Sequence, residues 1–273
     1  MTAPRINPDG PLKGRVALVT GASRGIGEAI AVRLAMEGAR IAVSARTAEA
    51  GESRLPGTLN DTIARIRAAG GEAVLIKADL AQAAERERLI EETTRALGEV
   101  DILVNNAAIT FFMPVADFTE KRFKLMMEVQ VYAPFHLAQL VLPGMRARRQ
   151  GWIVNISSGA GIDPKPPYGG RAIGGTVYGM CKAALERFST GLASEVFADG
   201  VAVNAVSPGL VATPGVAVHG LITEATRDRV QPIEYIAEAV YRLASGDPAV
   251  LTGRIAYAEP LLAELGLTPS ALV

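Results

Sequence analysis

The sequence predicts an α/β fold with a doubly wound parallel sheet of about seven strands and helices on both faces. Short apolar runs, such as residues 16–19 and 40–44, alternate with longer segments whose apolar residues recur at helical spacing. Such runs suit the strands of a parallel sheet that helices bury on both faces. Repeated strand and helix alternation implies right-handed crossovers. No proline- or serine-rich linker divides the 273 residues, so one domain is expected.

The expected elements follow one another in alternation along the chain. Strands are expected at residues 16–19, 40–44, 73–77, 101–104, 152–156, 201–206 and 254–257. Helices are expected at residues 28–36, 58–69, 82–97, 117–149 and 177–197, and a last helix has Pro232 as its first residue. Pro134 predicts a kink in the longest helix because proline has no N–H to donate. Loops are expected at residues 48–57, 159–176 and 207–231.

The composition argues against several classes of function. Lys plus Arg (28) equals Asp plus Glu (28), so no net charge draws the chain to nucleic acid or to an anionic membrane. A single cysteine and two histidines exclude an internal disulfide framework and argue against a metal site. No apolar run approaches the ~20 residues that a membrane span needs, and residues 1–11 lack the apolar core of a signal peptide. A small-molecule function in the cytoplasm is therefore expected.

The stretch from Thr20 to Gly27 joins the first expected strand to the first expected helix. Its glycines follow the pattern G-x-x-x-G-x-G at positions 21, 25 and 27. Glycine permits positive φ and close approach of a phosphate, and a helix N-terminus offers free N–H donors. The stretch is therefore interpreted as a cradle for a dinucleotide pyrophosphate. No Gly-Lys-Ser/Thr follows it, which disfavours a P-loop NTPase.

Polar residues after the expected strands are candidates for chemistry, because ligands of doubly wound sheets bind at the carboxyl ends of the strands. Ser157 and Ser158 end the fifth strand, and Tyr178 and Lys182 lie four apart on the next helix. Residues at this spacing share a helix face, so the Lys182 ammonium is expected to lower the pKa of the Tyr178 phenol. Tyr178 is then a candidate general acid for a carbonyl oxygen, which a serine hydroxyl would also bind. An isolated Tyr-x-x-x-Lys pair is more often a solvated helix face.

These motifs are not isolated. Together they resemble the short-chain dehydrogenase/reductase family in order and position, and the resemblance extends over residues 13–253. The motifs that carry it are the glycine loop, Asn105-Asn106-Ala107, Ser158 and Tyr178-Gly179-Met180-Cys181-Lys182. The resemblance implies a Rossmann fold in which Tyr178 is the catalytic acid/base and Lys182 supports it and binds the nicotinamide ribose. Ser158 matches the substrate-orienting serine, with Ser157 as the alternative. We expect an N-terminal extension at residues 1–12, the Rossmann-fold domain at 13–258, and a tail at 259–273 that packs on the domain or on a neighbouring subunit.

The resemblance also implies which residues bind the cofactor. Asp79 matches the residue that contacts the adenine, and Asn106-Ala107-Ala108 matches the family's Asn-Ala-Gly turn, with Ala108 in place of glycine. Pro208-Gly209 and Thr213 match the segment that contacts the nicotinamide carboxamide. The full expected set is Gly21, Ser23, Arg24, Gly25, Ile26, Gly27, Arg46, Thr47, Asp79, Leu80, Asn106, Ala107, Ala108, Tyr178, Lys182, Pro208, Gly209, Val211 and Thr213.

The end of the second strand bears on the choice between NADP(H) and NAD(H). An acidic residue there would bind the ribose 2′-OH and repel a 2′-phosphate, and this sequence has Ala45. Arg46 and Arg24 offer guanidinium groups that suit a phosphate monoester. NADP(H) is therefore expected. NAD(H) is the alternative, since exposed arginines are also common on solvated surfaces.

Gln130 is the chief departure from the family, because the relay asparagine is expected at its position. Glutamine keeps the amide donor and acceptor, so it either holds the water chain toward Lys182 or marks a divergent activity. Residues 163–175 form an insertion that is expected to border the substrate pocket; Tyr168 within it cannot replace Tyr178, since no lysine follows four residues on. The Asp-Gly-Gly that the family often has after its last strand is also missing, which puts subunit contacts in doubt.

The expected substrate pocket is mostly apolar. Its candidates are Phe111-Phe112-Met113, the insertion and residues 216–222, although these side chains would equally suit a core or a lid. His219 is more often solvated than a substrate contact, and Cys181 is read as a small apolar residue. The expected function is hydride transfer between NADP(H) and a hydrophobic secondary alcohol or ketone, in a homo-oligomer (dimer or tetramer) as the resemblance implies. The alternative is an NAD(P)-binding sensor or scaffold with little turnover.

Overall fold

The computed structural model describes residues 5–166 and 174–273. Its main sheet has seven parallel strands in the order β3-β2-β1-β4-β5-β6-β9. This confirms the predicted doubly wound sheet, in which the strand order reverses between β1 and β4. The strands are β1 (Val16–Thr20), β2 (Arg40–Ala45), β3 (Ala73–Lys77), β4 (Ile102–Asn105), β5 (Gly151–Ile156), β6 (Val201–Ser207) and β9 (Ile255–Tyr257).

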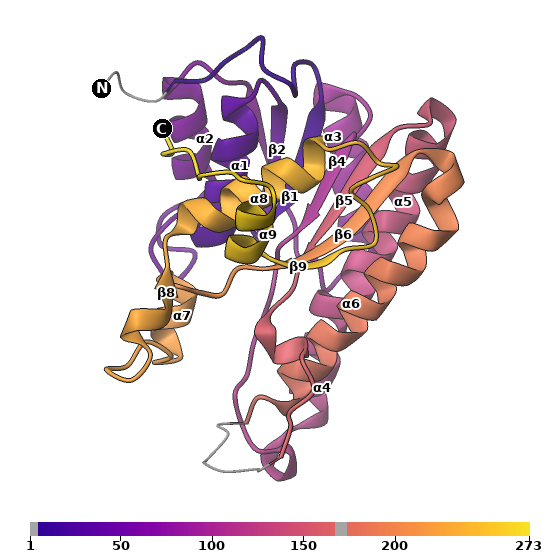
Figure 1. The fold of residues 1–273 in the computed structure, drawn as a ribbon. Coiled ribbons are helices and arrows are strands. Elements are labelled where there is room, and N and C mark those ends of the chain that lie inside the picture. The colour runs from indigo at the N-terminus through magenta and orange to yellow at the C-terminus, as the bar shows by residue number, and fades with distance from the viewer. Residues whose placement is uncertain (1–4, 167–173) are drawn as a thin grey trace.

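Helices cover both faces of the sheet (Figure 1). One layer contains α1 (Gly25–Met36), α2 (Leu59–Ala68), α8 (Ile233–Ser245) and α9 (Ala258–Glu264). The opposite layer contains α3 (Ala83–Leu97), α5 (Ala133–Arg148) and α6 (Thr176–Val196). A further helix, α4 (Glu120–Met127), packs beside α6.

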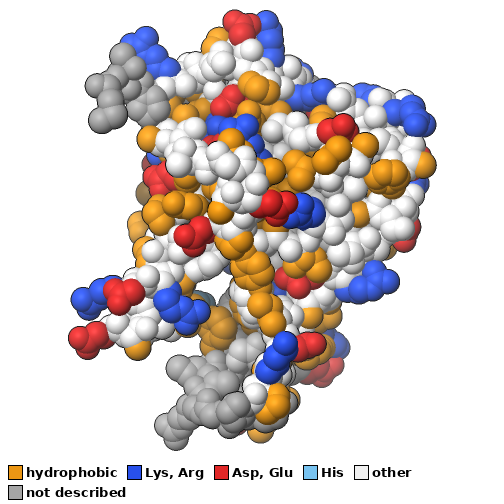
Figure 2. Space-filling view, viewed as in Figure 1, with side chains coloured by type: hydrophobic (Ala, Val, Ile, Leu, Met, Phe, Trp, Pro, Cys, Tyr) orange, Lys and Arg blue, Asp and Glu red, His pale blue; other side chains and the backbone are white. Residues whose placement is uncertain are grey.

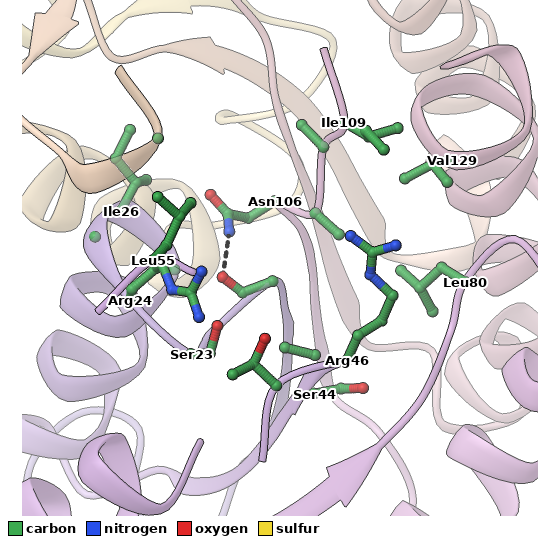
Figure 3. A pocket seen from close by; sticks show the side chains of 18 of the residues that line it. Ser23, Arg24, Ile26, Ser44, Arg46, Leu55, Leu80, Asn106, Ile109 and Val129 are labelled. Atoms are coloured by element: carbon green, nitrogen blue, oxygen red, sulfur yellow. Dashed lines mark hydrogen bonds between the residues drawn. The ribbon is translucent and has the colours of Figure 1, made fainter. Parts of the chain in front are cut away.

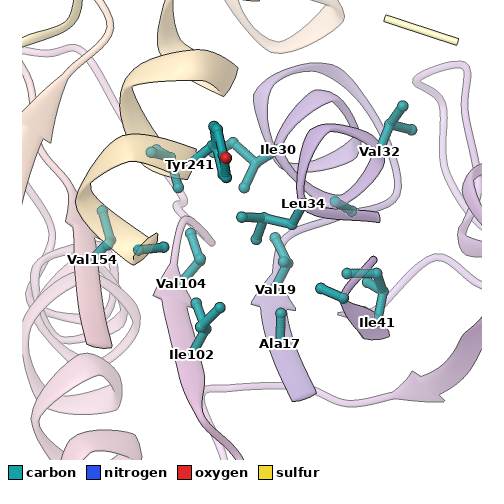
Figure 4. Packing of buried hydrophobic residues seen from close by; sticks show 14 of the residues in the cluster. Ala17, Val19, Ile30, Val32, Leu34, Ile41, Ile102, Val104, Val154 and Tyr241 are labelled. Carbon is teal, nitrogen blue, oxygen red and sulfur yellow. The ribbon is translucent and has the colours of Figure 1, made fainter. Parts of the chain in front are cut away.

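Each face of the sheet buries its own cluster of aliphatic side chains. On the first face Val19 and Val104 of the sheet pack against Leu34 of α1, with Tyr241 of α8 in the same cluster (Figure 4). Burial of one such side chain contributes about 1.5–3 kcal/mol. The two clusters make the sheet a rigid platform, and the loops that form the site extend from its carboxyl edge.

The segment expected to be one helix at residues 117–149 is irregular in the middle. After α4 it continues as a π-helical segment (Glu128–Tyr132) and then as α5. Pro134, where the sequence predicts a kink, lies in the first turn of α5, directly after this π-helical segment. π-Helical turns are frequent at functional sites, and this one contains Gln130.

Two other features differ from the sequence predictions: the segment after β6 and the position of Pro232. The segment after β6, expected to be a loop, contains β7 (Leu210–Val211), α7 (Pro214–Val218) and β8 (Val230–Gln231), and β7 pairs with β8. Pro232 precedes α8 as its N-cap residue, because its ψ of 140° is extended and not helical. The tail forms α9, whose Leu261 and Leu262 are buried in the first cluster.

Both ends of the described chain pack on this domain. Leu12 is buried, and the Asn7 N–H donates to the Met36 carbonyl at 2.8 Å. At the other end the Arg65 Nε donates to the Val273 backbone oxygen at 2.6 Å. Within residues 5–166 and 174–273, no helix has both the length and the apolar character that crossing a bilayer requires.

Candidate active site

The glycine turn between β1 and α1 forms part of a pocket at the carboxyl edge of the sheet. Gly21 and Gly25 have φ values of +66° and +55°, a backbone region that favours glycine. A Cβ atom on Gly27 would overlap the Gly21 carbonyl oxygen, so glycine there lets the helix start against the turn. Among the described residues no side chain caps α1, which leaves its first N–H groups available to an anion. This cradle fits the pyrophosphate of a dinucleotide.

The pocket above this turn has a volume of about 360 Å³. The Asn106 amide holds one wall in place, since its Nδ2 donates to the carbonyl oxygens of Thr20 (2.9 Å) and Gly21 (3.2 Å) (Figure 3). Many residues expected to bind the cofactor line this pocket: Gly21, Ser23, Arg24, Gly25, Ile26, Gly27, Arg46, Thr47, Asp79, Leu80, Asn106, Ala107, Ala108 and Thr213.

The two arginines expected to favour a phosphate differ in their surroundings. Arg24 is engaged by the loop after β2, because its Nη1 donates to Ser53 Oγ (3.2 Å) and its Nη2 to the Gly57 carbonyl (2.7 Å). Arg46 is exposed, and its side chain extends from the end of β2 into the pocket (Figure 3). Arg46 is therefore the better of the two candidates for binding a phosphate. The sequence alone did not rank the two arginines.

A second pocket of about 1120 Å³ adjoins the first and shares Ile26, Arg46, Asn106 and Thr213 with it. The remaining expected residues line this second pocket, except Gln130: Ser158, Tyr178, Lys182, Pro208, Gly209 and Val211. The cofactor-side pocket and the Ser158–Tyr178–Lys182 wall are thus continuous. This brings together residues that lie as far apart in the sequence as Gly21 and Thr213.

Tyr178 and Lys182 lie on one face of α6, as their spacing predicts. The Lys182 Nζ lies 5.5 Å from the Tyr178 ring centroid and donates to the Ile156 carbonyl at 2.9 Å. The predicted lowering of the Tyr178 pKa by Lys182 is wrong: burial raises the pKa of Tyr178, and a hydrogen bond with Ser158 offsets part of this rise. Burial also lowers the pKa of Lys182 to about 8, although the charge of Glu186 opposes this shift. Desolvation outweighs charge attraction at this site.

The two serines at the end of β5 have different partners. Ser157 is buried and its Oγ donates to Glu186 Oε1 at 2.6 Å. Ser158 is half-buried, and its Oγ accepts from the Ala160 N–H at 3.2 Å, which leaves its proton free to donate. This geometry favours Ser158 over Ser157 as the serine that meets a carbonyl oxygen.

Comparison with known proteins identifies the family. The family model described as "short chain dehydrogenase" matches residues 15–220. The chain belongs to the short-chain dehydrogenase/reductase family. Binding of NAD(P) is typical of this oxidoreductase family.

Individual members show how far the similarity extends. A 3-oxoacyl-[acyl-carrier-protein] reductase of Haemophilus influenzae is 33% identical over 248 residues, which cover 89% of this chain and 95% of the relative. A solved short-chain dehydrogenase of Mycobacterium thermoresistibile has a TM-score of 0.81 and 31% identity, over 94% of this chain and 89% of its own. A metagenomic short-chain oxidoreductase solved with NADP has a TM-score of 0.73 and 31% identity, over 90% of this chain and 98% of its own.

Gln130, at the position expected for the family's relay asparagine, is buried inside the π-helical segment. Its Nε2 donates to the Ile109 carbonyl at 2.8 Å. Its Oε1 is buried and has no hydrogen-bond partner in the described part of the chain. An unpaired buried acceptor is costly, so this oxygen is suited to accept from a water molecule. Gln130 lines neither pocket, and its role as a relay stays a prediction.

The far side of the second pocket is formed partly by the segment between β7 and β8. Figure 2 shows this segment projecting from the body, with charged side chains on its outside and a hollow beside it. His219 lies edge-on to Phe112, with ring centroids 4.9 Å apart, and Phe112 lies 5.6 Å from the Tyr178 ring. His219 is exposed, as the sequence predicts, and it also lines the pocket, so a contact between His219 and the substrate stays a prediction.

The other expected pocket residues divide between the second pocket and the core. Val216, Val218 and Leu221 line the pocket, whereas Phe111 packs in the small cluster that contains the buried Cys181. Phe111 and Met113 do not line it in the described structure. Most of the insertion, including Tyr168, lies at residues 167–173 and is outside the described residues.

Sequence reasoning missed Glu186 and Tyr257. Glu186 lies one turn beyond Lys182 on α6 and binds Ser157, while Tyr257 at the end of β9 lines the second pocket. Glu186 could have been found from its spacing, because Tyr178, Lys182 and Glu186 follow one another in steps of four residues. No local sequence pattern indicated Tyr257, because this residue reaches the pocket only through the pairing of β9 with β6.

Proposed function

We propose that this protein transfers a hydride between NADP(H) and a secondary alcohol or ketone, with Ser158, Tyr178 and Lys182 as its active site. The observation that carries the proposal is the continuity of the two pockets, since Ser158, Tyr178 and Lys182 line one of them and the glycine turn lines the other. The name of the relative from Haemophilus influenzae, a 3-oxoacyl reductase, supports a ketone as the substrate.

The bound dinucleotide would supply or accept the hydride, and the protein's own groups would manage the oxygen and its proton. In the reducing direction Ser158 donates a hydrogen bond to the carbonyl oxygen, and Tyr178 transfers its proton to that oxygen as the alkoxide develops. The raised pKa of Tyr178 keeps the phenol protonated at neutral pH, which suits this role. Lys182, with a pKa of about 8, is largely charged at neutral pH and would stabilise the phenolate that remains.

The preference for NADP(H) is proposed from Arg46 and from the absence of an acidic residue at the end of β2. The structural relative solved with NADP supports it. Arg46→Asp is expected to raise the KM for NADPH by about ten- to a hundred-fold, because a charged hydrogen bond to the 2′-phosphate is replaced by repulsion between two negative groups. The KM for NADH is expected to stay nearly unchanged or to fall. Steady-state kinetics with both cofactors would measure this.

Arg95→Asp, the same change at an exposed position of α3, is the matched control and should leave both KM values unaltered. An unchanged cofactor preference in Arg46→Asp, or equal wild-type affinity for NADH and NADPH, would show that the NADP(H) assignment is wrong.

The substrate is proposed to be hydrophobic, because Phe112, Val216, Val218 and Leu221 line the second pocket. A panel of aliphatic and aromatic ketones, followed by the loss of NADPH absorbance at saturating cofactor, tests the function. Turnover of bulky apolar ketones in preference to small polar ones is expected. NADPH binding without turnover of any ketone or alcohol would favour the sensor or scaffold alternative, which Gln130 motivates. The homo-oligomer and the cytoplasmic location stay predictions.

A further inference from the structure

Three consecutive residues at the end of β5 each face one of three positions on α6. The Ile156 carbonyl accepts from Lys182 and the Ser157 hydroxyl donates to Glu186, while Ser158 influences the pKa of Tyr178 and opposes the rise that burial causes. The α6 positions are four residues apart, so they form one row along a single face of the helix. Two of these three pairs contain the proposed active-site groups. The third, Ser157 with Glu186, has no role in the mechanism above.

Glu186 lies against the chain on both sides of Ser158. It accepts from the buried Ser157 Oγ at 2.6 Å, a length typical of a strong hydrogen bond to a carboxylate. Its carboxylate also packs against the next turn of the chain, since a Cβ atom on Gly161 would lie 3.0 Å from Glu186 Oε1. Ser157 before Ser158 and Gly161 after it therefore both lie close to the same carboxylate.

Glu186 also bears on the charge of Lys182, which lies one helical turn before it. Burial lowers the pKa of Lys182 to about 8, and two neighbours oppose this shift, first Cys181 and then Glu186. The other titratable groups that face this pair are Tyr178 on α6 and Tyr257 from β9, the last of which also feels the charge of Glu186. Of these groups Glu186 is the only carboxylic acid.

We propose that Glu186 is a positioning residue of the active site, which fixes the end of β5 through Ser157 and helps to keep Lys182 protonated. The inference deepens the proposed function and rests on it for the roles of Ser158 and Lys182. It assigns two separable effects to one carboxylate: a geometric effect through its hydrogen bond and an electrostatic effect through its charge.

Two substitutions separate these effects. Glu186→Gln keeps an acceptor for Ser157 but removes the charge, so the alkaline limb of the kcat/KM profile for ketone reduction is expected to move to lower pH by about one unit. Ser157→Ala keeps the charge but removes the hydrogen bond, so kcat is expected to fall about ten-fold while the alkaline limb stays in place. Glu91→Gln, the same change at an exposed position of α3, is the control and should alter neither quantity.

A purely structural role for Glu186 would lower thermal stability without moving the pH profile. The proposal is overturned if the profiles of Glu186→Gln and wild type superimpose and Ser157→Ala keeps the wild-type kcat. Should Glu186→Gln fail to fold, Glu186→Asp retains the charge with a shorter side chain, and it should lower kcat while leaving the alkaline limb in place; an unaltered kcat would contradict the geometric effect.

The pH dependence of NADPH binding separates this inference from the proposed function. If the wild type binds NADPH but reduces no ketone, the proposed function fails while the charge effect is still tested. The pH at which NADPH affinity falls, followed by cofactor fluorescence, should then be about one unit lower in Glu186→Gln than in the wild type. Coincident binding curves would overturn the electrostatic effect.

Discussion

Replacement of Tyr178 by phenylalanine is expected to lower kcat by about 10²- to 10⁴-fold, because the substitution removes the only proton that the proposed mechanism transfers to the carbonyl oxygen. The ring and its edge contact with Phe112 (centroids 5.6 Å apart) do not depend on the hydroxyl, so NADPH binding should be retained. Stopped-flow or steady-state loss of NADPH absorbance measures the rate, and cofactor fluorescence measures the binding.

Tyr235→Phe provides the matched control, since Tyr235 lies on α8 among residues that pack against the first core cluster. It loses the same hydroxyl away from the pockets and should keep nearly all of the activity. If Tyr178→Phe kept most of the wild-type rate on a ketone that the wild type reduces, Tyr178 would not be the proton donor.

Glu238→Ala is expected to cost about 3–5 kcal/mol of unfolding free energy, because it removes the fully buried one of the two carboxylates that pair with the buried Arg33 guanidinium. The Arg33 Nε donates to Glu238 Oε2 at 2.7 Å, and these side chains are only 2% and 0% exposed. Arg33 also pairs with Glu37 at 2.6 Å, and Arg242 binds the other Glu238 oxygen at 2.8 Å. The network joins the C-terminal end of α1 to α8, so urea unfolding should show the loss of unfolding free energy as a lower midpoint.

The same network predicts how stability depends on pH. Burial raises the pKa of Glu238, but hydrogen bonds and charge attraction from Arg33 and Arg242 outweigh burial and leave it lowered. A carboxylate with a lowered folded-state pKa stabilises the fold above its unfolded pKa, and this stability is lost as pH falls through the folded pKa. Glu238→Ala should therefore show a weaker dependence of stability on pH in the acid range.

Glu120→Ala is the control for this prediction, since Glu120 pairs with Lys124 at 2.5 Å on an exposed face of α4. An exposed pair of this kind contributes about 0–1 kcal/mol. If Glu238→Ala and Glu120→Ala lost the same amount of unfolding free energy, the account of a stabilising buried network would be contradicted.

The sequence was sufficient to predict those parts of the fold that correspond to a pattern of neighbouring residues. The strands of the sheet are apolar runs, and the glycine turn and the Tyr178-x-x-x-Lys182 pair are motifs with a fixed spacing. It was insufficient where two-residue strands leave no periodicity, as in β7 and β8. The π-helical segment was also not predicted, because its backbone hydrogen bonds do not follow from residue types alone.

The chemistry of the site depends on tertiary contacts that no local pattern contains. The Tyr178 pKa rises because the folded chain buries the phenol, whereas spacing alone indicated the opposite direction. The sequence already favoured Ser158 over Ser157, but the hydrogen bond that engages Ser157 comes from Glu186, which lies 29 positions after it. The choice of Arg46 over Arg24 depends on the loop whose Gly57 carbonyl engages Arg24.

Direct hydride transfer is the central claim, and transfer of label from NADPH deuterated at the nicotinamide C4 tests it most directly. With a ketone of the panel as substrate, mass spectrometry of the alcohol should find one deuterium at the carbinol carbon, from one of the two C4 labels only. Ser158, Tyr178 and Lys182 would then act on the oxygen and its proton alone. A product without the label, or no product at all from a protein that binds NADPH, would contradict the account.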